Sequence, residues 1–369
     1  MGGKSILILE RDPLKRKRRS FEIGYWRFSE YFVSERLLKE GWQVTSLDDE
    51  SMPHLWLLLK WMFRREWIAE YYLSLFQTAM LAFSRKSHPI ACAWQGPGFV
   101  FAAIRKLLAR SSETKLIVVM YYSYTHNTLR HAIIRRVLGW VLRDSTTIVC
   151  ITSTQRKEFE KSFRLKPGQV RYLRRGVDTV FFSPLAEDRE TGINDYVFCT
   201  GEYDRDDRLL LSACMDLGLK LIRVTKEPEY ALEILRIAKN IGVREIEVLM
   251  KVDAETLRRL YRNSLFVVVP VKNDTHPAGL TSLLESMACG KATIVSEGLT
   301  TEDYARDMVD AVYFNRGDLK SLKDRMALLR DDAHLRAVIG GNARKAVEDN
   351  HRIEDDVDGL MRVVGGLMA

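Results

Sequence analysis

Short apolar strands alternate with helix-length segments along the whole chain, and this alternation limits the folds open to it. Runs rich in β-branched residues occur in the first half at 5–10, 42–48, 90–95, 115–122 and 146–152. After Pro184 the pattern restarts, with runs at 195–201, 220–225, 245–250, 265–270, 292–296 and 311–314. Such alternation predicts an α/β fold in which helices cover both faces of parallel sheets.

A polar segment without periodicity, residues 183–195, separates the two series of strands. We interpret it as an interdomain linker. The sequence therefore predicts two doubly wound, Rossmann-like domains that face a cleft, residues 1–184 and 185–349. Residues 350–369 have a helical apolar pattern, and we expect them to return and pack on the first domain.

Composition narrows the partners and the compartment. The net charge is +8 and the pI is about 9.1, which favours anionic partners. Basic clusters at 15–19 and 130–136 lack the aromatic platform or recognition motif of a nucleic-acid-binding protein, so we expect no nucleic acid. The five cysteines are scattered in apolar runs, and no secretory signal pattern opens the chain. Buried free thiols and a cytoplasmic protein are the expectation.

Residues 54–83 differ from a plain core helix. Trp56, Trp61 and Trp67 alternate there with Lys60 and other cations, and charges interrupt the segment too often for a transmembrane span. One interpretation is a pair of amphipathic helices packed on the first sheet. The other is a helix that lies in an anionic membrane interface, with peripheral binding to the inner face of the membrane.

The richest local pattern is 272–296, "KNDTHPAGLTSLLESMACGKATIVS". A helix that starts at Gly279, directly after a strand, offers free N–H groups and a positive dipole end to a phosphate. Ala278 and Gly279 leave room for close approach. Glu285, about two turns on, could accept two hydrogen bonds from a ribose diol. A solvated helix acid is the alternative for Glu285 from the local pattern alone.

This stretch resembles the nucleotide-binding motif of retaining GT-B glycosyltransferases, especially the family-four group (glycosyl transferases group 1). Glu285, Met287, Ala288 and Gly290 match the second half of that motif. Segments at 170–184 and 196–218 and the run into the motif are also similar, so the resemblance covers nearly all of 170–320.

The resemblance implies that Glu285 binds the ribose of the donor. It implies that amides around Gly279, Leu280 and Thr281 bind phosphate and sugar. It also implies two cations for the diphosphate, for which Arg205 and Arg208 are the candidates. Pro277 stands where the family has the first Glu of its pair, and Asp274 or His276 would replace that contact to the sugar.

The first domain should bind the acceptor, and the resemblance there is one of pattern only. By position, His126 resembles the family's first-domain histidine that contacts the donor sugar, and it is our catalytic candidate. Lys15, Arg16, Arg18 and Gly24 occupy the place of the family's acceptor-side loop. They are candidates for holding an anionic acceptor or a lipid phosphate, with a solvated loop as the alternative.

The resulting expectation is a retaining, metal-independent hexosyltransferase. It would move a sugar from a UDP- or GDP-sugar to an acceptor hydroxyl, on a glycan or a lipid-linked carrier, without a cofactor. No DxD-like carboxylate pair lies in a suitable loop, and the acids at 204–207 are typical of a helix start. The alternative function is a catalytically weak or inactive nucleotide-sugar-binding partner of another transferase.

Overall fold

The computed structural model describes residues 5–9, 29–46, 54–55, 58, 61–62, 66–83, 88–108, 114–120, 129–143, 146–163, 165–184, 195–202, 204–273, 276–299, 301 and 303–368. The chain divides into two compact units. The first contains Phe28–Arg174, the N-terminal strand and Val357–Ala369. The second contains Arg175–Asp356.

The first unit is built on a parallel sheet with the strand order β2-β1-β3-β4-β5-β6. Its strands are β1 (Ser5–Leu9), β2 (Gln43–Ser46), β3 (Ile90–Trp94), β4 (Lys115–Met120), β5 (Thr146–Cys150) and β6 (Val170–Tyr172). The first five match the predicted strand runs. The order reverses at β1, as in doubly wound folds.

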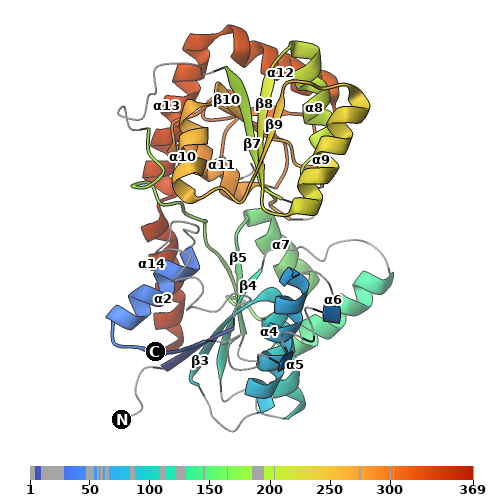
Figure 1. The fold of residues 1–369 in the computed structure, drawn as a ribbon. Coiled ribbons are helices and arrows are strands. Elements are labelled where there is room, and N and C mark those ends of the chain that lie inside the picture. Colours follow the sequence, from blue (N-terminus) through green and yellow to red (C-terminus); the bar gives the residue numbers. More distant parts are fainter. Residues whose placement is uncertain are drawn as a thin grey trace. The chain divides into compact units, whose positions relative to one another are not determined.

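Helices cover both faces of this sheet (Figure 1). They are α2 (Ser29–Lys39), α4 (Glu66–Phe83), α5 (Gln95–Leu107), α6 (Leu129–Leu142), α7 (Ser153–Ser162) and α14 (Ile353–Met368). Alternate residues of each strand serve the two faces. In β1, Leu7 and Leu9 join the core under α4, α5, α6 and α7, whereas Ile6 and Ile8 join the core under α2 and α14.

The C-terminal helix α14 is part of the first unit although it follows the second unit in sequence. Val357 and Val364 are buried in one core with Ile6 and Leu37. The Lys115 ammonium also donates a hydrogen bond to the carbonyl of Leu367, which ties the end of α14 to β4. The first unit is therefore assembled from both ends of the chain.

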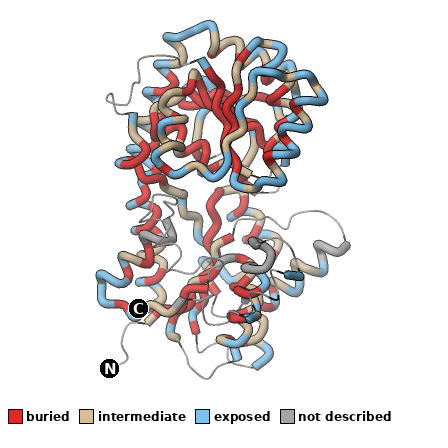
Figure 2. Tube along the Cα trace, in the orientation of Figure 1, coloured by how far each residue is buried: buried red, intermediate tan, exposed pale blue. Residues whose placement is uncertain are grey.

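The second unit repeats the plan with the strand order β12-β11-β10-β7-β8-β9, all parallel. Its strands are β7 (Tyr196–Thr200), β8 (Lys220–Thr225), β9 (Ile246–Met250), β10 (Phe266–Val269), β11 (Thr293–Ser296) and β12 (Val312–Phe314). Its helices are α8 (Asp207–Leu217), α9 (Pro228–Ile241), α10 (Ala254–Asn263), α11 (Leu280–Ala288), α12 (Leu319–Asp331) and α13 (Ala333–Asn350). Figure 2 shows the buried strands at the centre of this unit. Both sheets confirm the predicted α/β class.

Aspartates in the sequence determine where four helices of the second unit begin. The side chains of Asp206, Asp253, Asp318 and Asp332 each accept a hydrogen bond from a first-turn N–H and so cap α8, α10, α12 and α13. The acids at 204–207 do start a helix, as predicted, because Asp206 caps α8.

The segment before the predicted linker is held on the second unit. Arg258 donates to the carbonyl of Phe181, Arg262 to that of Ser183, and Arg344 to those of Thr179 and Phe182. Guanidinium groups thus satisfy four carbonyls of an irregular segment. The division between the two compact units lies at Arg174–Arg175, so this segment belongs to the second unit.

The cysteines agree with the expected buried free thiols. All five cysteines are free, and four of them are buried. Within the described ranges, the structure has no helix with the length and apolar character that crossing a bilayer requires.

Candidate functional site

The start of α11 forms a preorganised group of backbone donors at the carboxyl end of β10. Gly279, the N-cap, has φ +83°, and a Cβ there would lie 2.5 Å from Val269 Cγ1. Only glycine fits without strain. No side chain caps the helix, and no described residue accepts a hydrogen bond from the N–H of Thr281 or Ser282. These N–H groups and the helix dipole therefore remain available to an anion.

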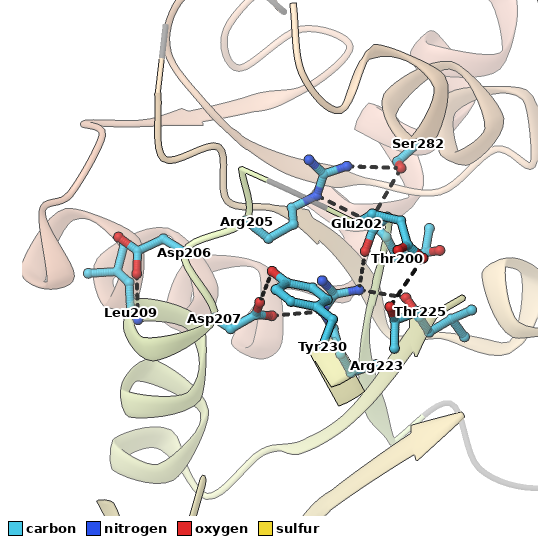
Figure 3. A network of polar contacts seen from close by, with 12 residues as sticks. Thr200, Glu202, Arg205, Asp206, Asp207, Leu209, Arg223, Thr225, Tyr230 and Ser282 are labelled. Atoms are coloured by element: carbon cyan, nitrogen blue, oxygen red, sulfur yellow. Dashed lines mark hydrogen bonds and ion pairs between the residues drawn. The ribbon is translucent and has the colours of Figure 1, made fainter. Parts of the chain in front are cut away.

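Arg205 lies beside this helix start. Its guanidinium donates from Nε to the Thr200 carbonyl (3.2 Å) and from Nη2 to Ser282 Oγ (3.4 Å), as Figure 3 shows. The residue exposes only 7% of its surface, and among the described residues no carboxylate forms an ion pair with it. Burial lowers the pKa of Arg205 from its ordinary value. A buried cation with neutral acceptors alone is costly, and an anionic ligand would offset that cost.

A second arginine nearby has a carboxylate partner and provides the contrast. Arg223 Nε donates to Asp207 Oδ1 at 2.7 Å (Figure 3). Its Nη1 donates to the Gly201 carbonyl at 2.7 Å. The Tyr230 hydroxyl donates to the other oxygen of Asp207. Arg223 therefore fixes the glycine turn after β7. The sequence interpretation missed it, although a cation within the buried run 220–225 was a signal.

Two loops are joined across the carboxyl ends of β7 and β10. The Asp206 N–H donates to the Pro270 carbonyl (2.8 Å), and the Lys272 N–H donates to the Asp204 carbonyl (2.9 Å). Arg205 and Val271 form an antiparallel bridge between these bonds. Because the β7 loop is fastened to the β10 loop, the Arg205 backbone is held next to the segment that leads into α11.

Glu285 is half-buried on α11 and is not a solvated helix acid. Its Oε2 accepts a hydrogen bond from the Tyr261 hydroxyl at 2.9 Å. Burial raises the pKa of Glu285 to about 7, while the Tyr261 hydrogen bond opposes that shift. Tyr261 is itself fully buried and packs edge-on against Phe198 and Phe182. Sequence reasoning did not find Tyr261, because a tyrosine in an amphipathic helix carries no local mark of this contact.

His276 is held by the β7 loop. Its Nε2 lies 3.2 Å from Asp204 Oδ2, and Asn273 Nδ2 donates to Asp204 Oδ1. Asp204 adopts φ +62°, a left-handed conformation that aims its carboxylate at the β10 loop. The His276 carbonyl accepts from the N–H of Ala278 (2.7 Å), which is buried beside Gly279. The structure thus brings His276, Ala278 and Gly279 into one turn.

The structure says less about the remaining site residues predicted from the sequence. Leu280 is buried and Thr281 is exposed in the first turn of α11. Arg208 is exposed near the start of α8, and its side chain makes no hydrogen bond or ion pair with the described residues. The candidates Asp274, His126, Gly24, Lys15, Arg16 and Arg18 lie outside the described residues. Within the described ranges, no three His, Cys, Asp or Glu side chains are grouped as metal ligands.

Residues 218–346 match the model of the protein family described as "Glycosyl transferases group 1". The matched range contains α11, Tyr261 and Glu285. No curated protein was found to match the sequence.

Solved structures share the fold of the whole chain. Sucrose-phosphate synthase from Thermosynechococcus elongatus superposes with a TM-score of 0.73 at 16% identity, over 100% of this chain and 99% of that one. HepE from Anabaena, solved with UDP-glucose, gives 0.70 at 12% identity over 98% and 99%. A glycosyltransferase from Rickettsia africae gives 0.66 at 11% identity over 100% and 99%.

The two parallel sheets, their strand orders and these structural matches define the class: the chain has the GT-B fold. Within this fold, residues 218–346 are similar to the group 1 glycosyltransferases. The comparisons therefore indicate a glycosyltransferase.

Proposed function

We propose that the protein is a retaining, metal-independent hexosyltransferase that uses a UDP- or GDP-sugar. The observation that carries the donor half of this proposal is the Arg205 guanidinium. It is buried, has no carboxylate partner among the described residues, and lies beside the free N–H groups of α11. A diphosphate supplies the negative charge that this arrangement lacks. The Anabaena structures of the same fold were solved with UDP and with UDP-glucose, which favours uridine among the bases.

Each donor-side residue then has a role. Glu285 accepts hydrogen bonds from the ribose diol, and Tyr261 holds its carboxylate in place. The amides that follow Gly279 bind the diphosphate together with Arg205, and Arg208 adds charge from the start of α8. His276, oriented by Asp204, contacts the sugar with Asp274, in the place where the family uses a glutamate.

The chemistry needs the leaving diphosphate to be stabilised as the glycosidic bond breaks. Arg205 and the α11 dipole do this without a metal ion, since both are fixed before the reaction starts. The acceptor hydroxyl attacks from the face that the leaving group departs from, and a phosphate oxygen takes its proton. His126 is proposed to contact the sugar from the first unit on its sequence position alone. No cofactor is required.

The acceptor half of the proposal rests on sequence. We assign a glycan or lipid-linked acceptor, with Gly24, Lys15, Arg16 and Arg18 on the acceptor side. The net charge of +8 supports peripheral binding at the anionic inner face of the membrane.

Titration calorimetry tests the donor half directly. UDP and GDP should bind more tightly than uridine and guanosine, and the sugar-loaded forms should bind at the same site. Incubation of the UDP-sugar with excess chelator should still release UDP. A protein that binds the nucleosides as well as the diphosphates would overturn the proposed site.

The second candidate function is a nucleotide-sugar-binding partner without turnover. Pro277, where the family has a glutamate, favours it. Hydrolysis of the donor in the absence of acceptor separates the two functions, because only an active transferase releases free nucleotide diphosphate.

A further inference from the structure

The helix layer over one face of the first sheet has exposed apolar stripes. On α4, Tyr72, Phe76, Met80 and Phe83 follow one another at helical spacing on one face. On α6, Ile133, Val137 and Trp140 do the same. Each of the seven exposes between 45% and 61% of its surface. Isolated exposed apolar residues are ordinary, but contiguous stripes mark a surface that contacts something apolar.

The two stripes belong to one layer. Helix α5 lies between α4 and α6 and packs against both. Its outer end adds Leu107, which is exposed, and Lys106, whose ammonium lies 5.3 Å from the centre of the Trp140 ring. We call this set of exposed residues on α4, α5 and α6 the helix-layer face.

The charges on α5 and α6 are all positive, whereas α4 contains Glu66 and Glu70 near its start, away from its exposed apolar stripe. Helices α5 and α6 contain Lys106, Arg135 and Arg136 and no aspartate or glutamate. Arg136 is exposed beside Val137. Cations that flank exposed aromatic and aliphatic side chains are the pattern of a surface that enters the headgroup region of an anionic bilayer. The tryptophan with a lysine above its ring fits the boundary between lipid and water.

We propose that the helix-layer face of α4, α5 and α6 is the membrane-docking surface of this glycosyltransferase and that it takes anionic lipid. The seven apolar side chains enter the interface, and Lys106, Arg135 and Arg136 lie against the headgroups. A second copy of the chain fits less well, because its α5 and α6 would bring the same cations to the interface. The inference rests on the proposed peripheral membrane binding and is independent of the donor chemistry.

Vesicle co-sedimentation tests the surface. The wild-type protein should sediment with phosphatidylglycerol–phosphatidylcholine vesicles, bind weakly to phosphatidylcholine alone, and be partly released by salt. The pairs Phe76→Ser with Met80→Ser on α4, and Ile133→Ser with Val137→Ser on α6, should each weaken binding on the order of tenfold. Arg136→Glu should weaken it at low salt only. The two pairs are on separate helices, so a folding failure of one leaves the other as the test.

The matched control lies in the second unit. Leu232→Ser with Leu235→Ser removes two exposed leucines from α9 and should leave vesicle binding unchanged. Three results would overturn the inference: no sedimentation of the wild type with anionic vesicles, equal losses in the α9 control, or a solution dimer that the α4 or α6 pair converts to monomer.

UDP calorimetry on the same samples separates this inference from the proposed function. A protein that binds UDP but ignores vesicles contradicts the surface and leaves the donor site standing. A protein that binds vesicles but not UDP contradicts the donor site and leaves the surface standing.

Discussion

The Glu285 carboxyl group lies in a half-buried position that suits a ligand but lowers the stability of the folded protein when the group is ionised. Burial disfavours its ionised form and raises its pKa to about 7. A ribose diol donates hydrogen bonds, so it prefers the ionised carboxylate. Ligand binding and loss of a proton are therefore coupled at this residue.

The first prediction follows from that coupling. Below pH 7 the free protein holds Glu285 protonated, and UDP binding must then expel the proton. UDP affinity should therefore fall between pH 8 and pH 6, by up to about tenfold per unit below pH 7. Calorimetry at several pH values measures it. Glu285→Gln is the control, because its remaining pH dependence reports the phosphate alone, and identical profiles would remove Glu285 from the site.

The same substitution has opposite effects on binding and on stability. Glu285→Gln should weaken UDP binding by roughly 1.5–3 kcal/mol, through loss of a charged hydrogen bond. The folded pKa of about 7 lies above the ordinary value of 4.5, so the carboxyl group's stability contribution is present below pH 4.5 and is lost as the pH rises to 7. At pH 8 the ligand-free variant should therefore melt at a higher temperature than the wild type. A lower melting temperature there would contradict the assigned burial cost.

Arg205 carries the third prediction. Arg205→Ala should weaken UDP binding far more than uridine binding, since the proposed contact is to the diphosphate. Competition binding with both ligands measures the ratio. Arg208→Ala, at an exposed position, shows whether the second cation contributes. Equal losses for UDP and uridine in Arg205→Ala would assign that residue a structural role.

At the scale of elements, the site depends on a strand-to-helix turn that only glycine can make. Gly279→Ala places a Cβ against Val269 and forces alanine to φ +83°. We expect a loss of about 1–3 kcal/mol in the free energy of unfolding, together with weaker UDP binding.

Denaturant unfolding with and without UDP measures both effects of Gly279→Ala. Gly341→Ala in α13 is the matched control, because a Cβ there meets nothing within 4 Å and the residue is helical. It should stabilise the protein by roughly 0.5–1 kcal/mol. If both alanine variants behaved alike, the turn would not be the constraint that we describe.

At the scale of the whole molecule, α14 belongs to the core of the first unit although it follows the second unit in the sequence. Val364→Asp buries a charge in the core with Ile6 and Leu37 and should destabilise the first unit by about 3–5 kcal/mol. Met368→Asp, at an exposed position of the same helix, should have little effect. Calorimetric unfolding of both variants measures the difference. A Val364→Asp variant as stable as the wild type would show that α14 is not needed for the first core.

The sequence by itself determined the strands and the class of fold. β-branched apolar runs and capping aspartates act over a few residues, so their effects are readable from local pattern. The same locality explains why the Gly279 helix start and Glu285 stood out: a strand, a glycine and a lone acid lie within one short stretch. The run at 170–172 was not predicted as a strand, because β6 is short and pairs only with β5.

Only the tertiary structure decided which side chains meet. Tyr261 reaches Glu285 from another helix, and Arg223 on β8 pairs with Asp207 at the start of α8. The fold buries Arg205 without a carboxylate partner among the described residues, whereas it leaves Arg208 exposed to solvent. Neither the pairing nor the burial of these side chains can be predicted from the residues next to them in the sequence. Desolvation and ion pairing depend on what the fold brings within a few ångströms, and that is set by contacts between residues far apart in the chain.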